Sequence, residues 1–170
     1  MSITDYLIDS SLVLLVLLQI RERELTMRAV LRPLIIVAVA VANYVHGIPT
    51  AGNDLVLILG LALTGGLIGI LSGQAVLMRR GRHGEVLARS GWLSSFYWVL
   101  GMGSRFAFVF WLTHWGGRTI AQWGASHSIT SFEAWTVALL AMAAFEVAGR
   151  SAVLAWRRHD LQRVAQPELV

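Results

Sequence analysis

The hydrophobic positions of this chain fall into five long runs separated by short polar segments. The runs cover residues 3–20, 31–47, 55–78, 92–115 and 132–156. A helix needs about 20 apolar residues to cross the roughly 30 Å hydrocarbon core of a bilayer. The last three runs reach that length, and the first two require local thinning or polar ends among the headgroups. The pattern therefore predicts an all-α protein, a five-transmembrane-helix bundle in a single domain over residues 1–170.

The composition favours the same class of protein. Hydrophobic residues make up 56% of the chain and charged residues 14%, whereas soluble domains are roughly 25% charged. The sequence contains no cysteine, which excludes disulfides, iron–sulfur clusters and thiol catalysis. All 14 basic residues are arginine, a bias typical of GC-rich bacterial genomes.

The arginines predict the orientation of the five helices. Twelve of them lie in connections that share one side of a five-span bundle: Arg21, Arg23, Arg28, Arg32, Arg79, Arg80, Arg82, Arg89, Arg150, Arg157, Arg158 and Arg163. The opposite side has Arg118 alone. The positive-inside rule then places the N-terminus outside and the C-terminus in the cytoplasm of a bacterial plasma membrane. The basic residues would then face the anionic lipid headgroups on the cytoplasmic side of the membrane. Nucleic acid is therefore not an expected partner.

Two short segments resemble each other and indicate an internal repeat. Glu24 and Arg28 open one hairpin of spans, and Glu85 and Arg89 open the next. Residues four apart share a helix face, so each pair would interact there. The prediction is two parallel helix hairpins plus an N-terminal helix. The alternative is that two short basic loops resemble each other without common structure.

Small residues in the third span predict close helix packing. Gly65, Gly69 and Gly73 recur at spacing four, which lets two helix backbones approach closely. The partner is either another helix of this chain or a second copy, so a homo-oligomer or a partner subunit stays open.

Arg105 is the most informative residue, because it lies about halfway along the fourth span. An unpaired arginine at that depth costs at least ~2.5–3.5 kcal/mol. Glu146 lies in the fifth span at a similar depth, since the two heights differ by roughly 6 Å at 1.5 Å rise per residue. We therefore expect these two side chains to pair.

Arg150 follows Glu146 by four residues and shares its helix face, and Gln74 lies at the inner end of the third span. Together with Arg105 these residues predict a buried charge network with net positive charge. Two interpretations stay open. The network is a structural ion pair that fixes helix register, or it binds an anionic ligand, a lipid or a partner helix.

Three histidines, His46, His114 and His127, lie on the predicted outer side. Neutral imidazoles ligate zinc, copper or haem iron, so a haem or metal cofactor is one hypothesis. No tight ligand spacing supports it, and histidines that cap helices among headgroups are the alternative. Residues 119–124 also fit either a short interfacial helix or an ordinary loop.

The chain resembles the CcdC-like family of small bacterial membrane proteins. The shared features are the Arg/Glu-rich stretch before Arg32-Pro33, the short second span, Arg105 in the penultimate span, and Arg150 followed by Arg157-Arg158. The resemblance implies a helical membrane protein and nothing about chemistry.

The sequence shows no motif of an assembled catalytic site. A P-loop, a dinucleotide fingerprint, HExxH and GxSxG are all absent, so an enzyme is not favoured. The preferred prediction is a non-enzymatic accessory, assembly or ligand-binding membrane subunit that uses the buried arginine network. The alternatives are a small transporter or channel for an anionic or polar solute, and a haem- or metal-binding protein.

Overall fold

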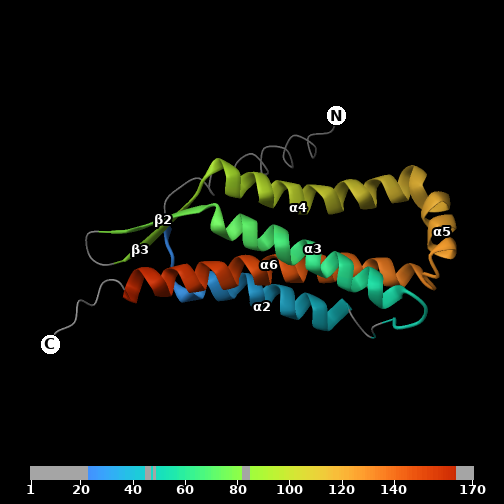
Figure 1. Ribbon diagram of the computed structural model, residues 1–170, viewed down its shortest axis with the longest axis horizontal. Coiled ribbons are helices and arrows are strands. Elements are labelled where there is room, and N and C mark those ends of the chain that lie inside the picture. Colours follow the sequence, from blue (N-terminus) through green and yellow to red (C-terminus); the bar gives the residue numbers. More distant parts are fainter. Residues whose placement is uncertain (1–22, 45–46, 48, 82–84, 164–170) are drawn as a thin grey trace, which may run out of the picture.

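The computed structural model describes residues 23–44, 47, 49–81 and 85–163 (Figure 1). The elements follow in the order β1 (Arg23–Glu24), α2 (Met27–Tyr44), α3 (Asp54–Gln74), β2 (Val76–Arg80), β3 (Val86–Ser90), α4 (Trp92–Trp111), a π-helical turn (Leu112–Gly116), α5 (Gly117–Ser126) and α6 (Phe132–Arg163). Helices α2, α3, α4 and α6 run along the long axis, with the strands at one end and α5 across the other.

Helices α3 and α6 form the most extensive contact of the fold, and glycines line it. A Cβ at Gly65 would overlap the backbone of Met142, and one at Gly69 would overlap the backbone of Glu146. From the other side, a Cβ at Gly149 would lie 2.7 Å from the carbonyl oxygen of Gly66. The two backbones therefore touch without intervening side chains. The partner of the glycine face is within this chain.

The prediction of an all-α bundle is wrong, because the basic connection after α3 forms two strands, which β1 extends to a sheet. Its three strands have the order β1-β3-β2 and both pairings are antiparallel. The predicted third span, 55–78, thus ends at Gln74, and its last residues enter β2. Val76 and Val86 are buried, so the sheet packs its apolar positions against the bundle.

The five-span bundle is also wrong. Among the residues that the structure describes, two helices are long and apolar enough to cross a membrane, α3 and α6. Helix α4 carries Arg105 together with serines, glycines, tryptophans and a tyrosine, which lower its hydropathy. Helix α2 has a shorter apolar stretch, 30–43. The predicted span 3–20 lies outside the described residues, and the predicted position of the N-terminus, which depended on five spans, no longer follows.

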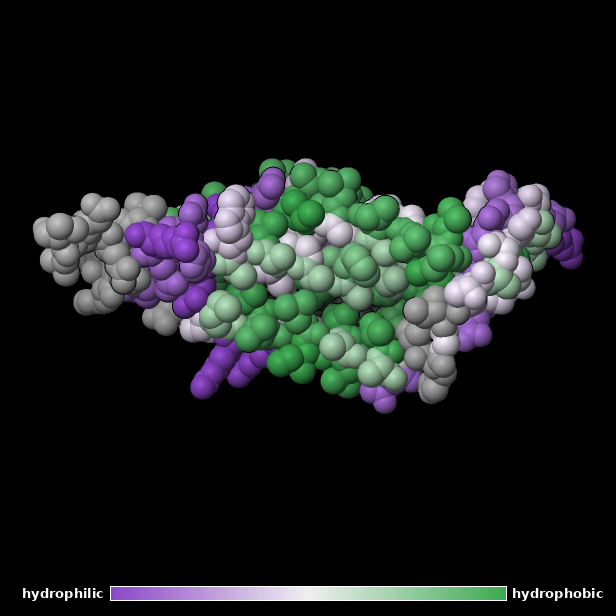
Figure 2. Space-filling view, turned by 60° about the horizontal axis from the view of Figure 1, so that its bottom comes forward, coloured by the Kyte–Doolittle hydropathy of each residue, from purple (hydrophilic) through white to green (hydrophobic). Residues whose placement is uncertain are grey.

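Helices α3 and α6 do not resemble the core helices of a soluble protein. Only 28% of the most apolar stretch of α3 and 33% of that of α6 are buried. Large apolar side chains such as Ile36, Leu63 and Phe106 are exposed on α2, α3 and α4. In Figure 2 the middle of the visible face is hydrophobic and its ends are polar, as expected of a protein that contacts a membrane.

The predicted repeat does not form two helix hairpins. Glu24 belongs to β1 and residues 85–89 lead into and form β3, so neither pair four residues apart lies on a helix. The two segments instead pair with each other, with Glu24 opposite Leu87.

Two local features complete the helical structure. Pro33 lies inside α2, which begins six residues earlier at Met27. Residues 119–124 belong to α5, a helix of 10 residues, and the helical alternative for that segment is confirmed. A π-helical turn joins α4 to α5, and such turns often bend a helix.

Gly69→Leu should destabilise the fold, because its side chain would push α3 away from the Glu146 backbone. Overpacking of this kind costs about 1–3 kcal/mol. The control is Gly60→Leu on the same helix, where a Cβ meets nothing within 4 Å. Unfolding is measured in detergent for both variants. Equal stabilities of the two variants would contradict the packing described here.

Candidate functional site

A buried ion pair joins α4 to α6. Arg105 Nη1 donates to Glu146 Oε2 at 2.7 Å, and the two side chains are 18% and 8% exposed. This length is typical of a charge-assisted hydrogen bond. The expected meeting of these two residues is therefore present in the structure, and each charge has its counter-charge in a largely buried contact.

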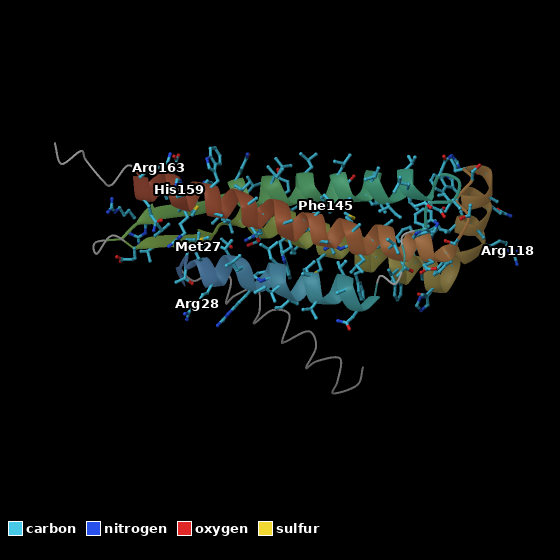
Figure 3. All side chains as sticks on the ribbon, turned by 90° about the horizontal axis from the view of Figure 1, so that it is seen from below. Met27, Arg28, Arg118, Phe145, His159 and Arg163 are labelled. Atoms are coloured by element: carbon cyan, nitrogen blue, oxygen red, sulfur yellow. The ribbon has the colours of Figure 1, made fainter. Side chains whose placement is uncertain are left out.

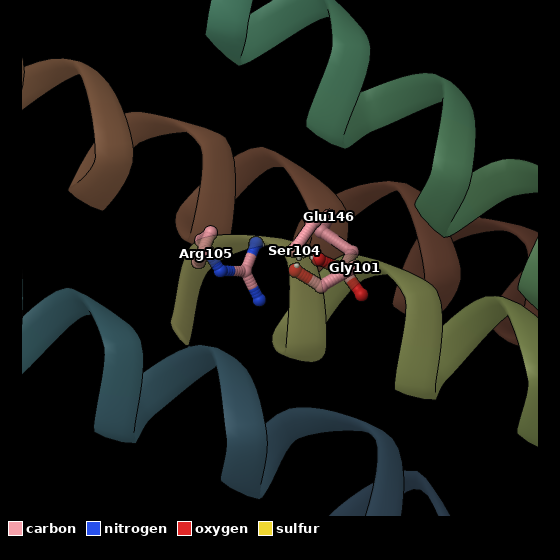
Figure 4. A network of polar contacts seen from close by, with 4 residues as sticks. All are labelled: Gly101, Ser104, Arg105 and Glu146. Atoms are coloured by element: carbon pink, nitrogen blue, oxygen red, sulfur yellow. Dashed lines mark hydrogen bonds and ion pairs between the residues drawn. The ribbon is translucent and has the colours of Figure 1, made fainter. Parts of the chain in front are cut away.

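Glycine makes room for this pair (Figure 4). Gly101 lies one helical turn before Arg105, and a Cβ there would come within 2.5 Å of both carboxylate oxygens of Glu146. Glu146 itself sits where Gly69 brings the α3 backbone against α6. The carboxylate thus reaches the surface of α4 in the space that Gly101 leaves.

Arg150 lies one turn from Glu146 and has different partners. Its Nη1 donates to Ser72 Oγ, and its Nη2 donates to Ser90 Oγ at 3.4 Å. Ser72 and Ser94 in turn bond to each other's backbone carbonyls. The guanidinium therefore lies where the ends of α3, β3 and α4 meet, and it is surrounded by neutral hydroxyls.

The charges of this region do not cancel. Arg105 uses the carboxylate of Glu146 directly, while Glu146 acts on Arg150 only through a longer-range charge interaction. Within the described residues, Arg150 forms no ion pair at 4.0 Å or less. Two cations and one anion leave one positive charge in excess, and the excess lies on Arg150.

Two further arginines fix α6 to the strand end of the molecule. Arg157 Nη1 donates to the carbonyls of Gly73, Gln74 and Val76 at 2.8–3.1 Å. Gly73 and Gln74 end α3, where a helix leaves carbonyls without intrahelical partners, and Val76 begins β2. Arg158 Nε donates to the Leu25 carbonyl at 2.9 Å. Their roles are structural, and the sequence interpretation counted them only as charges in a loop.

Gln74 does not join the network as expected. The residue is exposed, and its backbone carbonyl, rather than its side chain, takes the bond from Arg157. The residues that replace it are Ser72, Ser90 and Ser94. Serines in apolar helices carry little sequence signal, because they also serve as small packing residues.

The structure does not assemble the histidines. His114 stacks on Phe110, His127 stacks on Trp123, and each Nδ1 lies 2.9 Å from a carbonyl of the preceding turn. His46 is outside the described residues. Across the part of the chain that is described, no three His, Cys, Asp or Glu side chains are placed to hold a metal ion.

Asp54 is a buried polar residue that the sequence interpretation did not single out. It lies in the first turn of α3 and is 0% exposed. Its carboxylate accepts the backbone N–H of Thr130 at 2.8 Å and the Thr130 hydroxyl at 2.5 Å. A carboxylate is favourable at a helix N-terminus, so Asp54 fastens the loop before α6 to α3.

In comparisons with protein-family models, curated proteins and solved structures, nothing matches this chain. The resemblance to the CcdC-like family stays a prediction.

Gly101→Ala should destabilise the protein without changing any charge. The added methyl would displace the Glu146 carboxylate from Arg105, and overpacking costs about 1–3 kcal/mol. Gly103→Ala is the matched control, since a Cβ at Gly103 meets nothing within 4 Å. The control should be neutral or gain up to ~1 kcal/mol from better helix propensity. Thermal unfolding in detergent compares the two, and identical shifts would show that Glu146 does not lie over Gly101 in solution.

Proposed function

We propose that this chain is a non-enzymatic integral membrane protein of the bacterial plasma membrane, an accessory or ligand-binding subunit that binds an anionic ligand. The observation that carries the proposal is the excess charge at Arg150. A buried cation is expensive in a membrane protein and marks a functional site by default. Arg105 has its carboxylate, whereas Arg150 has serine hydroxyls. An anion would supply the counter-charge that Arg150 lacks.

The distribution of charge supports one orientation of the helices. Exposed arginines gather at the strand end of the molecule, where Arg28 and Arg163 are labelled in Figure 3. The opposite end shows Arg118 on α5. The positive-inside rule assigns the strand end to the cytoplasm. An anionic ligand would then reach Arg150 from the cytoplasmic side.

Single cysteines test this orientation directly, because the native chain contains none. Cysteine at Gln122, exposed on α5, should react with a membrane-impermeant maleimide in intact cells. Cysteine at Arg80, exposed on β2, should react only after the membrane is permeabilised. Labelling of the Arg80→Cys variant in intact cells would overturn the orientation.

Anion binding should stabilise the purified protein. A ligand that binds the folded state adds about 2.7 kcal/mol at a concentration 100 times its Kd. Titrating phosphatidylglycerol into the full chain in neutral detergent should raise the melting temperature in a saturable way. Phosphatidylcholine of the same chain length is the control and should have a much smaller effect. Equal effects of the two lipids would contradict the proposed function.

A further inference from the structure

The guanidinium of Arg150 donates hydrogen bonds to neighbouring serine hydroxyls. A guanidinium carries five N–H donors, and serine hydroxyls engage two of them through Ser72 and Ser90. Ser90 accepts from Arg150, so its own hydroxyl hydrogen is free to point to a further acceptor. Planar guanidinium donors match the geometry of phosphate oxygens and bind them in pairs.

The N-terminus of α4 adds an independent set of donors beside this guanidinium. Ser90 ends β3, Gly91 is the N-cap of α4, and no side chain caps the first turn. The first N–H groups of a helix have no partner within the helix, and their partial positive charge favours an anion. Ser94, in this first turn, bonds to Ser72, which also holds Arg150. The helix end and the guanidinium therefore belong to one cluster.

The depth of this cluster matches the level of lipid phosphates. Helix α3 has 21 residues, which at 1.5 Å per residue is about 31 Å, close to the ~30 Å hydrocarbon thickness. Ser72 lies in its last turn, so the cluster sits where the hydrocarbon core ends and the headgroups begin.

From these observations we propose that Arg150, Ser90 and the first turn of α4 form a binding site for a phosphate group. The inference rests on the proposed function, because it names the site and the chemical class of the anion. The phosphate belongs either to the headgroup of an anionic phospholipid or to a soluble phosphate. Arg105 takes no part, since Glu146 already neutralises it.

The decisive variant is Ser90→Asp. Its carboxylate would lie beside the Arg150 guanidinium, where Nη2 now reaches the Ser90 hydroxyl at 3.4 Å. It would supply the missing counter-charge from within the chain, so the fold should be kept. Binding of phosphatidylglycerol should be lost. Arg150→Lys keeps the charge but removes the planar donor pair, and affinity should fall roughly tenfold, the equivalent of one charge-assisted hydrogen bond.

The control is Arg80→Gln, which removes an exposed charge from the same end of the molecule and should leave affinity close to wild type. The measurement is the melting titration of each full-length variant with phosphatidylglycerol, and in a separate arm with inorganic phosphate. If the protein binds only phosphatidylglycerol, the ligand is a lipid headgroup. If it binds both probes, the phosphate group itself is recognised. Either result supports the site if Ser90→Asp abolishes the binding.

Two results would count against the proposals and can be told apart. If wild type binds phosphatidylglycerol and Ser90→Asp binds it equally well, the phosphate site is wrong while the proposed function stands. If wild type binds neither probe, the proposed function fails and the site fails with it.

Discussion

The contact between the backbones of α3 and α6 is the constraint on which the rest of the structure depends. In a bilayer the hydrophobic effect does not drive helices together, so close van der Waals packing must do so. Gly65 and Gly69 allow that packing against Met142 and Glu146. Because no side chain separates the two helices here, the Glu146 side chain is directed away from α3. Gly101 leaves space for it on α4, which brings the third long helix into register with the other two.

Arg105 and Arg150 show two ways to keep a cation within an apolar protein. Arg105 is held by a carboxylate, and removing one member of such a pair would leave a desolvated charge. Arg150 is held by hydroxyls, which accept two of its hydrogen bonds without cancelling its charge. The first arrangement is complete in itself. The second leaves its charge uncancelled by the described residues, and this difference is the physical basis of the proposed anion site.

The sequence predicted those features that follow from spacing and depth along helices. The glycine spacing indicated a close packing face, and counting residues from the span ends indicated that Arg105 and Glu146 lie at similar depth. It failed where the chain changes structure within an apolar run. Val76 and Leu77 continue the hydropathy of α3, so nothing in the run marks the strand that begins there. Ser90, far from Arg150 in sequence, joins the site only through that unpredicted sheet.

Helix α6 is longer than the bilayer needs. Its 32 residues extend about 48 Å, roughly 18 Å more than the hydrocarbon thickness. The excess runs beside the sheet, where Arg157 and Arg158 bind it to α3 and to the chain after β1. One continuous helix thus carries the Glu146 carboxylate, the uncancelled cation of Arg150 one turn (about 6 Å) further along, and the anchors of the sheet. A rigid rod of this kind couples the two environments mechanically: tilting the sheet must tilt the helix that presents Arg150 and Glu146.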